Sequence, residues 1–154
     1  MHNLVMTTCI AGGIALPLLL ASCSSKAEDT VILDRETVLD SSGVMLSCEP
    51  PLLKHRRDSE ILLDVDGKWA VAPPWKELRF ANGPNVTLEI VAVGTGGQTF
   101  RSSVIGGAYG ADGPRVCITF APQIPRGIHI KELHISSSHP ITCRRIVWRE
   151  FDAL

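Results

Sequence analysis

The sequence lacks an excess of charge of either sign. Its 154 residues contain 15 lysines and arginines against 16 aspartates and glutamates, which leaves a formal net charge of -1. A chain without a basic field has no electrostatic footprint for nucleic acid, so we expect no nucleic-acid partner. With 45% hydrophobic residues the chain is also too apolar for intrinsic disorder. This composition predicts one globular domain.

The short motifs that mark common catalytic sites are missing as well. The sequence contains no Gly-x-Ser-x-Gly elbow, no Ser-x-x-Lys and no His-Glu-x-x-His, and its glycine clusters precede no predicted helix. His129, His134 and His139 are spaced five apart, without the partner ligands of a zinc site. Residues 64–67, Asp-Val-Asp-Gly, match only half of a calcium loop and lack its further oxygen ligands, so a plain turn is the better interpretation. We therefore predict no catalytic residue, no metal and no cofactor.

Long hydrophobic runs are absent except near the amino terminus. Residues 10–21 read IAGGIALPLLLA, which is shorter than the roughly 20 apolar residues of a membrane-spanning helix. This length is typical of the core of a signal peptide. The segment before it contains no Lys or Arg, which departs from the positively charged start that signal peptides usually have.

The apolar run ends in Leu20-Ala21-Ser22-Cys23. These residues resemble the lipobox of bacterial lipoprotein precursors, in which small residues and an invariant Cys follow a Leu. The resemblance covers only the leader and implies that the signal peptide, residues 1–22, is removed and that Cys23 carries the lipid. Ser24 after the Cys implies, in a bacterium with two membranes, the outer membrane and a domain facing the periplasm. Ordinary secretion with a chance Cys is the alternative.

A short tether, residues 23–30, separates the candidate lipid site from the first strand-like run at Val31. The seven residues between them span at most about 25 Å when fully extended. A lipid on Cys23 would therefore hold the domain of residues 31–154 close to a membrane of the cell envelope.

Beyond the leader, strand-like runs replace helical periodicity. They recur every eight to twelve residues between turn residues, which predicts an all-β fold, a single antiparallel β-sandwich that is jelly-roll-like. The parity of apolar residues shifts at Lys131-Glu132 and at Arg144-Arg145, which predicts a β-bulge at each. Residues 86–93 and 98–104 should form a hairpin, and we expect 116–120 to pair with 128–135. The other predicted strands are 31–39, 44–48, 61–65, 69–71, 77–80 and 141–148.

Three cysteines remain once Cys9 and Cys23 are assigned to the leader and the lipid site. Alternation places Cys48 and Cys143 on apolar faces and Cys117 opposite its apolar neighbours. In the oxidising compartment that export implies, we predict a Cys48–Cys143 disulfide. Because parity does not fix register, the other pairings stay open.

Two loops offer a candidate ligand surface. Two prolines precede Trp75 and would hold its indole on a loop or an edge, although burial is the common fate of Trp. Arg56 and Arg57 belong to a basic cluster that starts at Lys54, for which a solvated loop is the alternative.

Together these features predict a membrane-anchored envelope lipoprotein that acts as a non-catalytic binding, interaction or structural module. Its expected partners are the membrane, through the lipid anchor, and an envelope protein or glycan. The alternative is an inhibitor or immunity lipoprotein that blocks a wall-degrading enzyme. A glycan hydrolase that uses a carboxylate pair such as Asp64 and Glu89 is a third hypothesis. The oligomeric state stays open.

Overall fold

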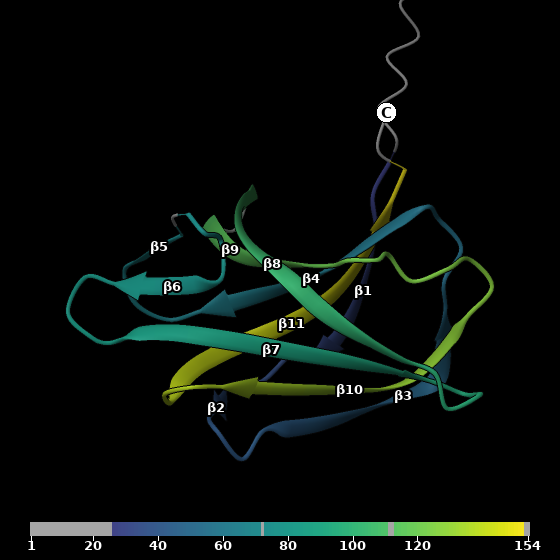
Figure 1. The fold of residues 1–154 in the computed structure, drawn as a ribbon, viewed down its shortest axis with the longest axis horizontal. Coiled ribbons are helices and arrows are strands. Elements are labelled where there is room, and N and C mark those ends of the chain that lie inside the picture. Colours follow the sequence, from purple (N-terminus) through teal and green to yellow (C-terminus); the bar gives the residue numbers. More distant parts are fainter. Residues whose placement is uncertain (1–25, 72, 111–112, 153–154) are drawn as a thin grey trace, which may run out of the picture.

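The computed structural model describes residues 26–71, 73–110 and 113–152 (Figure 1). The predicted signal peptide and Cys23 lie outside the described residues. Within them there is no helix long and apolar enough to cross a membrane. The described residues form eleven strands: β1 (Glu28–Leu33), β2 (Thr37–Leu39), β3 (Val44–Leu53), β4 (Asp58–Val65), β5 (Trp69–Val71), β6 (Glu77–Phe80), β7 (Asn85–Gly94), β8 (Thr99–Gly110), β9 (Gly113–Phe120), β10 (His129–Ser137) and β11 (Ile141–Phe151).

The strands form one antiparallel sheet that folds back on itself. Its order is β1-β11-β4-β9-β8-β7-β10-β3, with β2 beside β11, and β5 and β6 continuing from β7. Strand β8 connects the two halves, because its first residues pair with β7 and its later residues with β9. The end strands β1 and β3 approach each other around a hollow of about 250 Å³. The predicted all-β, antiparallel, sandwich-like fold is confirmed.

Alternating side chains fill the interior of this fold. In β7, Val86, Leu88, Ile90 and Ala92 are buried, and the residues between them point outward. Trp148 of β11 is 2% exposed and its indole lies against the Phe120 ring, at 6.2 Å between centroids. A buried aromatic pair of this kind supplies a large share of the apolar area that stabilises a small domain.

Two predicted details of the strands are confirmed. The pairing register of β10 shifts between Ile130 and Glu132, and that of β11 shifts between Cys143 and Arg145, as the parity changes predict. Strands β7 and β8 form the predicted hairpin, with Val91 opposite Arg101.

Other predicted details are wrong. The predicted strand 31–39 is divided into β1 and β2, and both parts pair with β11. Strands β9 and β10 do not pair with each other. Instead β9 lies between β4 and β8, and β10 lies between β3 and β7. The connection between them, residues 121–128, is too long for a tight hairpin, and it carries the chain from one half of the sheet to the other.

Candidate functional site

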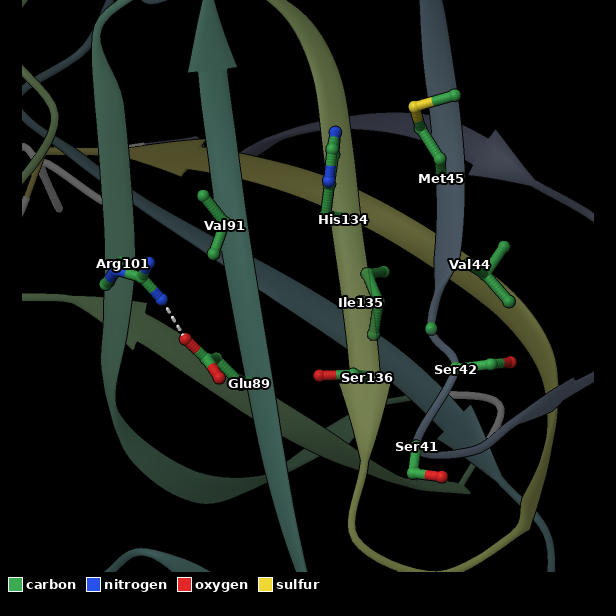
Figure 2. A pocket seen from close by; sticks show the side chains of 11 residues that line it. Ser41, Ser42, Val44, Met45, Glu89, Val91, Arg101, His134, Ile135 and Ser136 are labelled. Atoms are coloured by element: carbon green, nitrogen blue, oxygen red, sulfur yellow. Dashed lines mark hydrogen bonds and ion pairs between the residues drawn. The ribbon is translucent and has the colours of Figure 1, made fainter.

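An open groove of about 370 Å³ lies on the outer face of β3, β10, β7 and β8 (Figure 2). The pairing register places four of its side chains in one row across the strands, from Met45 through His134 and Val91 to Arg101. These residues alternate with the buried core positions, so their side chains point outward. The groove is lined by Ser41, Ser42, Gly43, Val44, Met45, Glu89, Val91, Arg101, His134, Ile135 and Ser136.

The main polar groups of the groove are Ser136 and Glu89, in the neighbouring row, and Arg101 at the end of the first row. Ser136 lies opposite Glu89 in the register, and the Glu89 carboxylate forms an ion pair with the Arg101 guanidinium (Figure 2). The side chains of Glu89 and Arg101 are 54% and 70% exposed. An exposed ion pair contributes little to folding, so these groups are available to a ligand.

The turn between β2 and β3 forms one wall of the groove. Asp40 accepts hydrogen bonds at Oδ1 from the Ser42 amide, at 2.9 Å, and from the Ser42 hydroxyl. These bonds lower the pKa of the Asp40 carboxyl. Gly43 follows with a φ of +76°, a left-handed conformation that favours glycine. The wall is therefore held by local hydrogen bonds before any ligand arrives.

The groove continues into a second hollow of about 360 Å³, which shares Ser41, Glu89 and Ser136 with the first. At its far end the Ser138 hydroxyl accepts a hydrogen bond from the Thr87 amide at 3.0 Å, and the Ser138 amide donates to the Thr87 carbonyl at 3.0 Å. The two hollows make a trough along β7 from Thr87 to Val91, a length of about 13 Å. No motif in the sequence predicts this trough, although its polar residues are present among the outward positions of β7 and β10.

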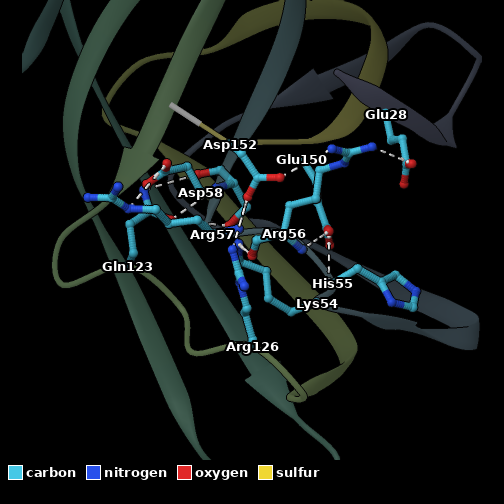
Figure 3. Close-up of polar contacts among 11 residues, drawn as sticks. Glu28, Lys54, His55, Arg56, Arg57, Asp58, Gln123, Arg126, Glu150 and Asp152 are labelled. Carbon is cyan, nitrogen blue, oxygen red and sulfur yellow. Dashed lines mark hydrogen bonds and ion pairs between the residues drawn. The ribbon is translucent and has the colours of Figure 1, made fainter. Parts of the chain in front are cut away.

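The basic cluster after β3 forms a different kind of structure, a network that fastens both ends of the domain (Figure 3). The Arg56 guanidinium donates to Glu28 of β1 at 2.7 Å and to Asp152, just after β11, at 3.3 Å. The Arg57 amide and the Arg126 guanidinium also donate to Asp152, at 2.9 Å and 3.1 Å. The hydrogen bond from the Arg56 guanidinium lowers the pKa of Glu28, and the hydrogen bond from the Arg57 amide is the main cause of the lowered pKa of Asp152. We call these five residues the terminal latch.

Glu150 anchors the loop of the latch from inside the protein. Its side chain is buried, and its Oε2 accepts hydrogen bonds from the amides of His55 and Arg56, both at 2.9 Å. Its Oε1 accepts a hydrogen bond from Trp148 Nε1 at 3.0 Å. Lys54 is also buried, and its ammonium donates to the Arg56 carbonyl. Burial lowers the pKa of Lys54.

The latch changes the interpretation of the predicted ligand surface. Arg56 is 24% exposed and its guanidinium is engaged by Glu28 and Asp152, so its contacts lie within the domain. Arg57 is 69% exposed. The structure does not bring either arginine to Trp75: the loop between β3 and β4 lies at the right of Figure 1, and the turn between β5 and β6 lies at the upper left.

Trp75 occupies the turn between β5 and β6, and its side chain is exposed, as the prolines before it suggested. Its φ is +62°, a conformation that costs a bulky residue about 1–2 kcal/mol. The Trp75 carbonyl accepts a hydrogen bond from the Ile105 amide at 2.8 Å, and the Arg79 guanidinium donates to the Pro73 carbonyl at 3.3 Å. These bonds hold the turn in its strained conformation.

The predicted Cys48–Cys143 disulfide is not formed, since Cys48, Cys117 and Cys143 are all free thiols. The face assignments were right: Cys48 and Cys143 are buried, and Cys117 points outward from β9, where its thiol donates to Glu60 at 2.7 Å. Cys48 belongs to β3 and Cys143 to β11, in different halves of the sheet. Parity could not specify their positions along the strands. Burial raises the pKa of Cys48 and of Cys143 to about 11.

The carboxylates considered for a hydrolase are not brought together. Asp64 lies on β4 and forms an ion pair with Arg115 at 2.9 Å, whereas Glu89 lies on β7 and is paired with Arg101. Two strands, β9 and β8, separate β4 from β7 in the sheet. A glycosidase needs two carboxyl groups that flank one bond, so this pair does not provide such a site.

The described residues contain no group of three or more potential metal ligands. His129 and His134 both point outward from β10, and the His134 ring lies 3.2 Å from Glu132. Comparison of the chain with models of known protein families, with curated proteins and with solved structures found no match.

Proposed function

We propose that the protein is a lipid-anchored lipoprotein of the bacterial cell envelope and that its β-domain is a non-catalytic binding module. The observation that carries this proposal is the lipobox that ends in Cys23, together with the strand-rich domain that begins close behind it with β1 at Glu28. Even a fully extended chain spans only about 17 Å over these residues. A lipid on Cys23 would therefore hold the folded domain at the membrane surface.

The contacts of β1 support this role. Asp29 accepts two hydrogen bonds from the Arg149 guanidinium, at 2.7 Å and 2.9 Å, and Glu28 is held by Arg56. The strand is also paired with β11 from Glu28 onward. Because these contacts fix β1 to the rest of the sheet, a tether attached to β1 leaves the domain little freedom relative to its lipid anchor. The terminal latch lies at the same end and would face the membrane.

The outer groove supports binding as the task of the domain. Its side chains project from four hydrogen-bonded strands, so the ligand contacts are placed on a rigid surface. The groove offers hydrogen-bonding groups of several kinds, whereas the candidate hydrolase carboxylates lie on separate strands.

Substitution of the lipid site tests the proposal. Cys23→Ala should abolish incorporation of labelled palmitate, leave the signal peptide uncleaved and release the protein from its stable membrane association. Cys9→Ser is the matched control, because it removes a cysteine of the leader and should leave labelling and processing unchanged. If Cys23→Ala is processed to the same size and stays on membranes as the unaltered chain does, the lipoprotein proposal is wrong.

One observation favours the second candidate, an inhibitor or immunity lipoprotein. Trp75 is exposed on a strained turn, and Trp side chains are frequent anchors in protein interfaces. Under this candidate function a wall-degrading enzyme should co-purify with the full chain and be lost with Trp75→Ala. Retention of the enzyme by Trp75→Ala, or absence of any such enzyme, would leave the binding module as the better proposal.

A further inference from the structure

We infer that the trough on the outer face of β3, β10, β7 and β8 binds an uncharged, hydroxyl-rich glycan chain. The inference rests on the proposed function, because it assigns a ligand class to the proposed binding module. The trough consists of the two hollows that share Ser41, Glu89 and Ser136. Its shape is elongated and open, which suits a linear chain that passes over the sheet.

The polar groups of the trough match the hydroxyl groups of sugars. Ser41, Ser136 and Ser138 line it, and a serine hydroxyl both donates and accepts hydrogen bonds, as a sugar hydroxyl does. The Glu89 carboxylate accepts from hydroxyl groups, and the Arg101 guanidinium donates to hydroxyl or carbonyl oxygens. Both side chains are more than half exposed, so a ligand can reach them.

The charges of the trough favour a neutral ligand. The negative charge of Glu89 is cancelled by the positive charge of Arg101 beside it. A polyanion or polycation would gain attraction from one member of this pair and repulsion from the other. An uncharged chain meets no such opposition.

Two apolar side chains, Met45 and Val91, complete the surface. Met45 is 63% exposed, and both lie in the same row, on either side of His134. The C–H faces of sugar rings are apolar, so they can cover these side chains while the hydroxyl groups reach the polar groups. An exposed methionine beside polar residues is typical of adaptable binding surfaces.

The backbone pairing of the strands beneath the trough argues against an extended peptide as the ligand. Strand β10 is paired on both sides, with β3 and β7. Its amides and carbonyls are therefore used in the sheet and cannot pair with an added strand. A ligand that lies over β10 must be recognised by side chains.

A titration of the full lipidated chain in detergent micelles tests the inference. The probes are triacetylchitotriose and cellotriose, which are uncharged trisaccharides, with trigalacturonate and a serine-rich octapeptide as comparators. We expect an uncharged trisaccharide to shift the backbone amide signals of Gly43, Glu89, His134 and Ser136. Preference for triacetylchitotriose indicates a wall-type glycan with N-acetyl groups, and preference for cellotriose indicates a plain surface polysaccharide. Either result supports the inference.

Three variants sharpen the test. Ser136→Tyr fills the trough with a side chain that strands tolerate well and should weaken binding at least tenfold. Glu89→Gln removes the charged acceptor and should weaken binding about tenfold. Glu36→Gln, an exposed position outside the trough, should change nothing.

The inference is overturned if neither uncharged trisaccharide binds, if only a comparator binds, or if the shifted signals surround Trp75 instead. Full binding by a folded Ser136→Tyr variant also overturns it. These outcomes are distinct from failure of the anchor, because palmitate labelling at Cys23 does not depend on the groove. A protein that carries the lipid but binds no glycan would refute only this inference.

Discussion

Removal of the Glu150 carboxylate should strongly destabilise the domain. In Glu150→Ala three donors lose their acceptor: the amides of His55 and Arg56 and the indole N–H of Trp148. A hydrogen bond to a charged group is worth about 1.5–3 kcal/mol, but neighbouring bonds are not additive and water can enter the loosened loop. We therefore expect a loss of about 4 kcal/mol in the free energy of unfolding. For a domain of this size the melting temperature should fall by about 12–20 °C.

Urea unfolding followed by tryptophan fluorescence measures this loss. Glu150→Gln should lose about 2 kcal/mol, because one amide oxygen cannot replace two carboxylate oxygens that face opposite donors. Glu36→Ala, which removes an exposed carboxylate, is the matched control and should change stability by less than about 0.5 kcal/mol. Trypsin should also cleave Glu150→Ala faster after Arg56 and Arg57. If Glu150→Ala stays within about 1 kcal/mol of the unaltered protein, the loop is not anchored by Glu150 and our account of the latch is wrong.

Three further predictions concern the thiols, the latch and the strained turn. The pKa values of Cys48 and Cys143, raised to about 11 from 9.0, mean that the folded state holds these two protons more tightly than the unfolded state does. The free energy of unfolding should therefore keep its full value below pH 9 and fall by about 2–3 kcal/mol per thiol as the pH rises towards 11. Urea unfolding at alkaline pH measures this loss. The pKa values of Glu28 and Asp152 are lowered in the folded state, so the terminal latch should stay closed above their ordinary pKa values of 4.5 and 3.8. It should open as the pH falls through the lower pKa values of the folded state. The amide chemical shifts of residues 55–57 would report the opening, and unchanged shifts in acid would contradict it. Trp75→Gly should be about 1 kcal/mol more stable than Trp75→Ala, since glycine adopts a positive φ without strain, and equal stabilities would show that the turn is not strained.

The sequence was informative about strands and faces, because alternation reports directly which side chains are buried. The strand 86–93, with Val86, Leu88 and Ile90 on one face, was placed within a residue of its ends, and the parity changes at Lys131 and Arg144 located both bulges. Signals of this kind are local, since each depends only on the order of neighbouring residues.

Contacts between distant segments could not be predicted in the same way. The latch joins Glu28, Arg56 and Asp152, and nothing in the spacing of these residues indicates that they meet. The expected pairing of strands 116–120 and 128–135 assumed that consecutive strands are neighbours, which the crossing connection overrides. The prediction of a Cys48–Cys143 disulfide was wrong for a related reason: two cysteines that both point inward need not lie side by side.

The trough shows where local signals fall short for function. Its lining comes from β3, β7, β8, β10 and the turn before β3, and the residues of its first row are ordinary outward residues of their own strands. Only the register of the sheet places Met45, His134, Val91 and Arg101 in one row. Trp75, in contrast, is a candidate for exposure on local grounds, because two prolines precede it, although burial is the common fate of Trp.

The most direct test of the central claim is mass spectrometry of the amino terminus of the protein isolated from bacterial membranes. Our account predicts that the mature chain begins at Cys23 and that this residue carries a diacylglyceryl group, with a further acyl chain on its amino group where the host completes the modification. An unmodified amino terminus at any other residue would contradict the account.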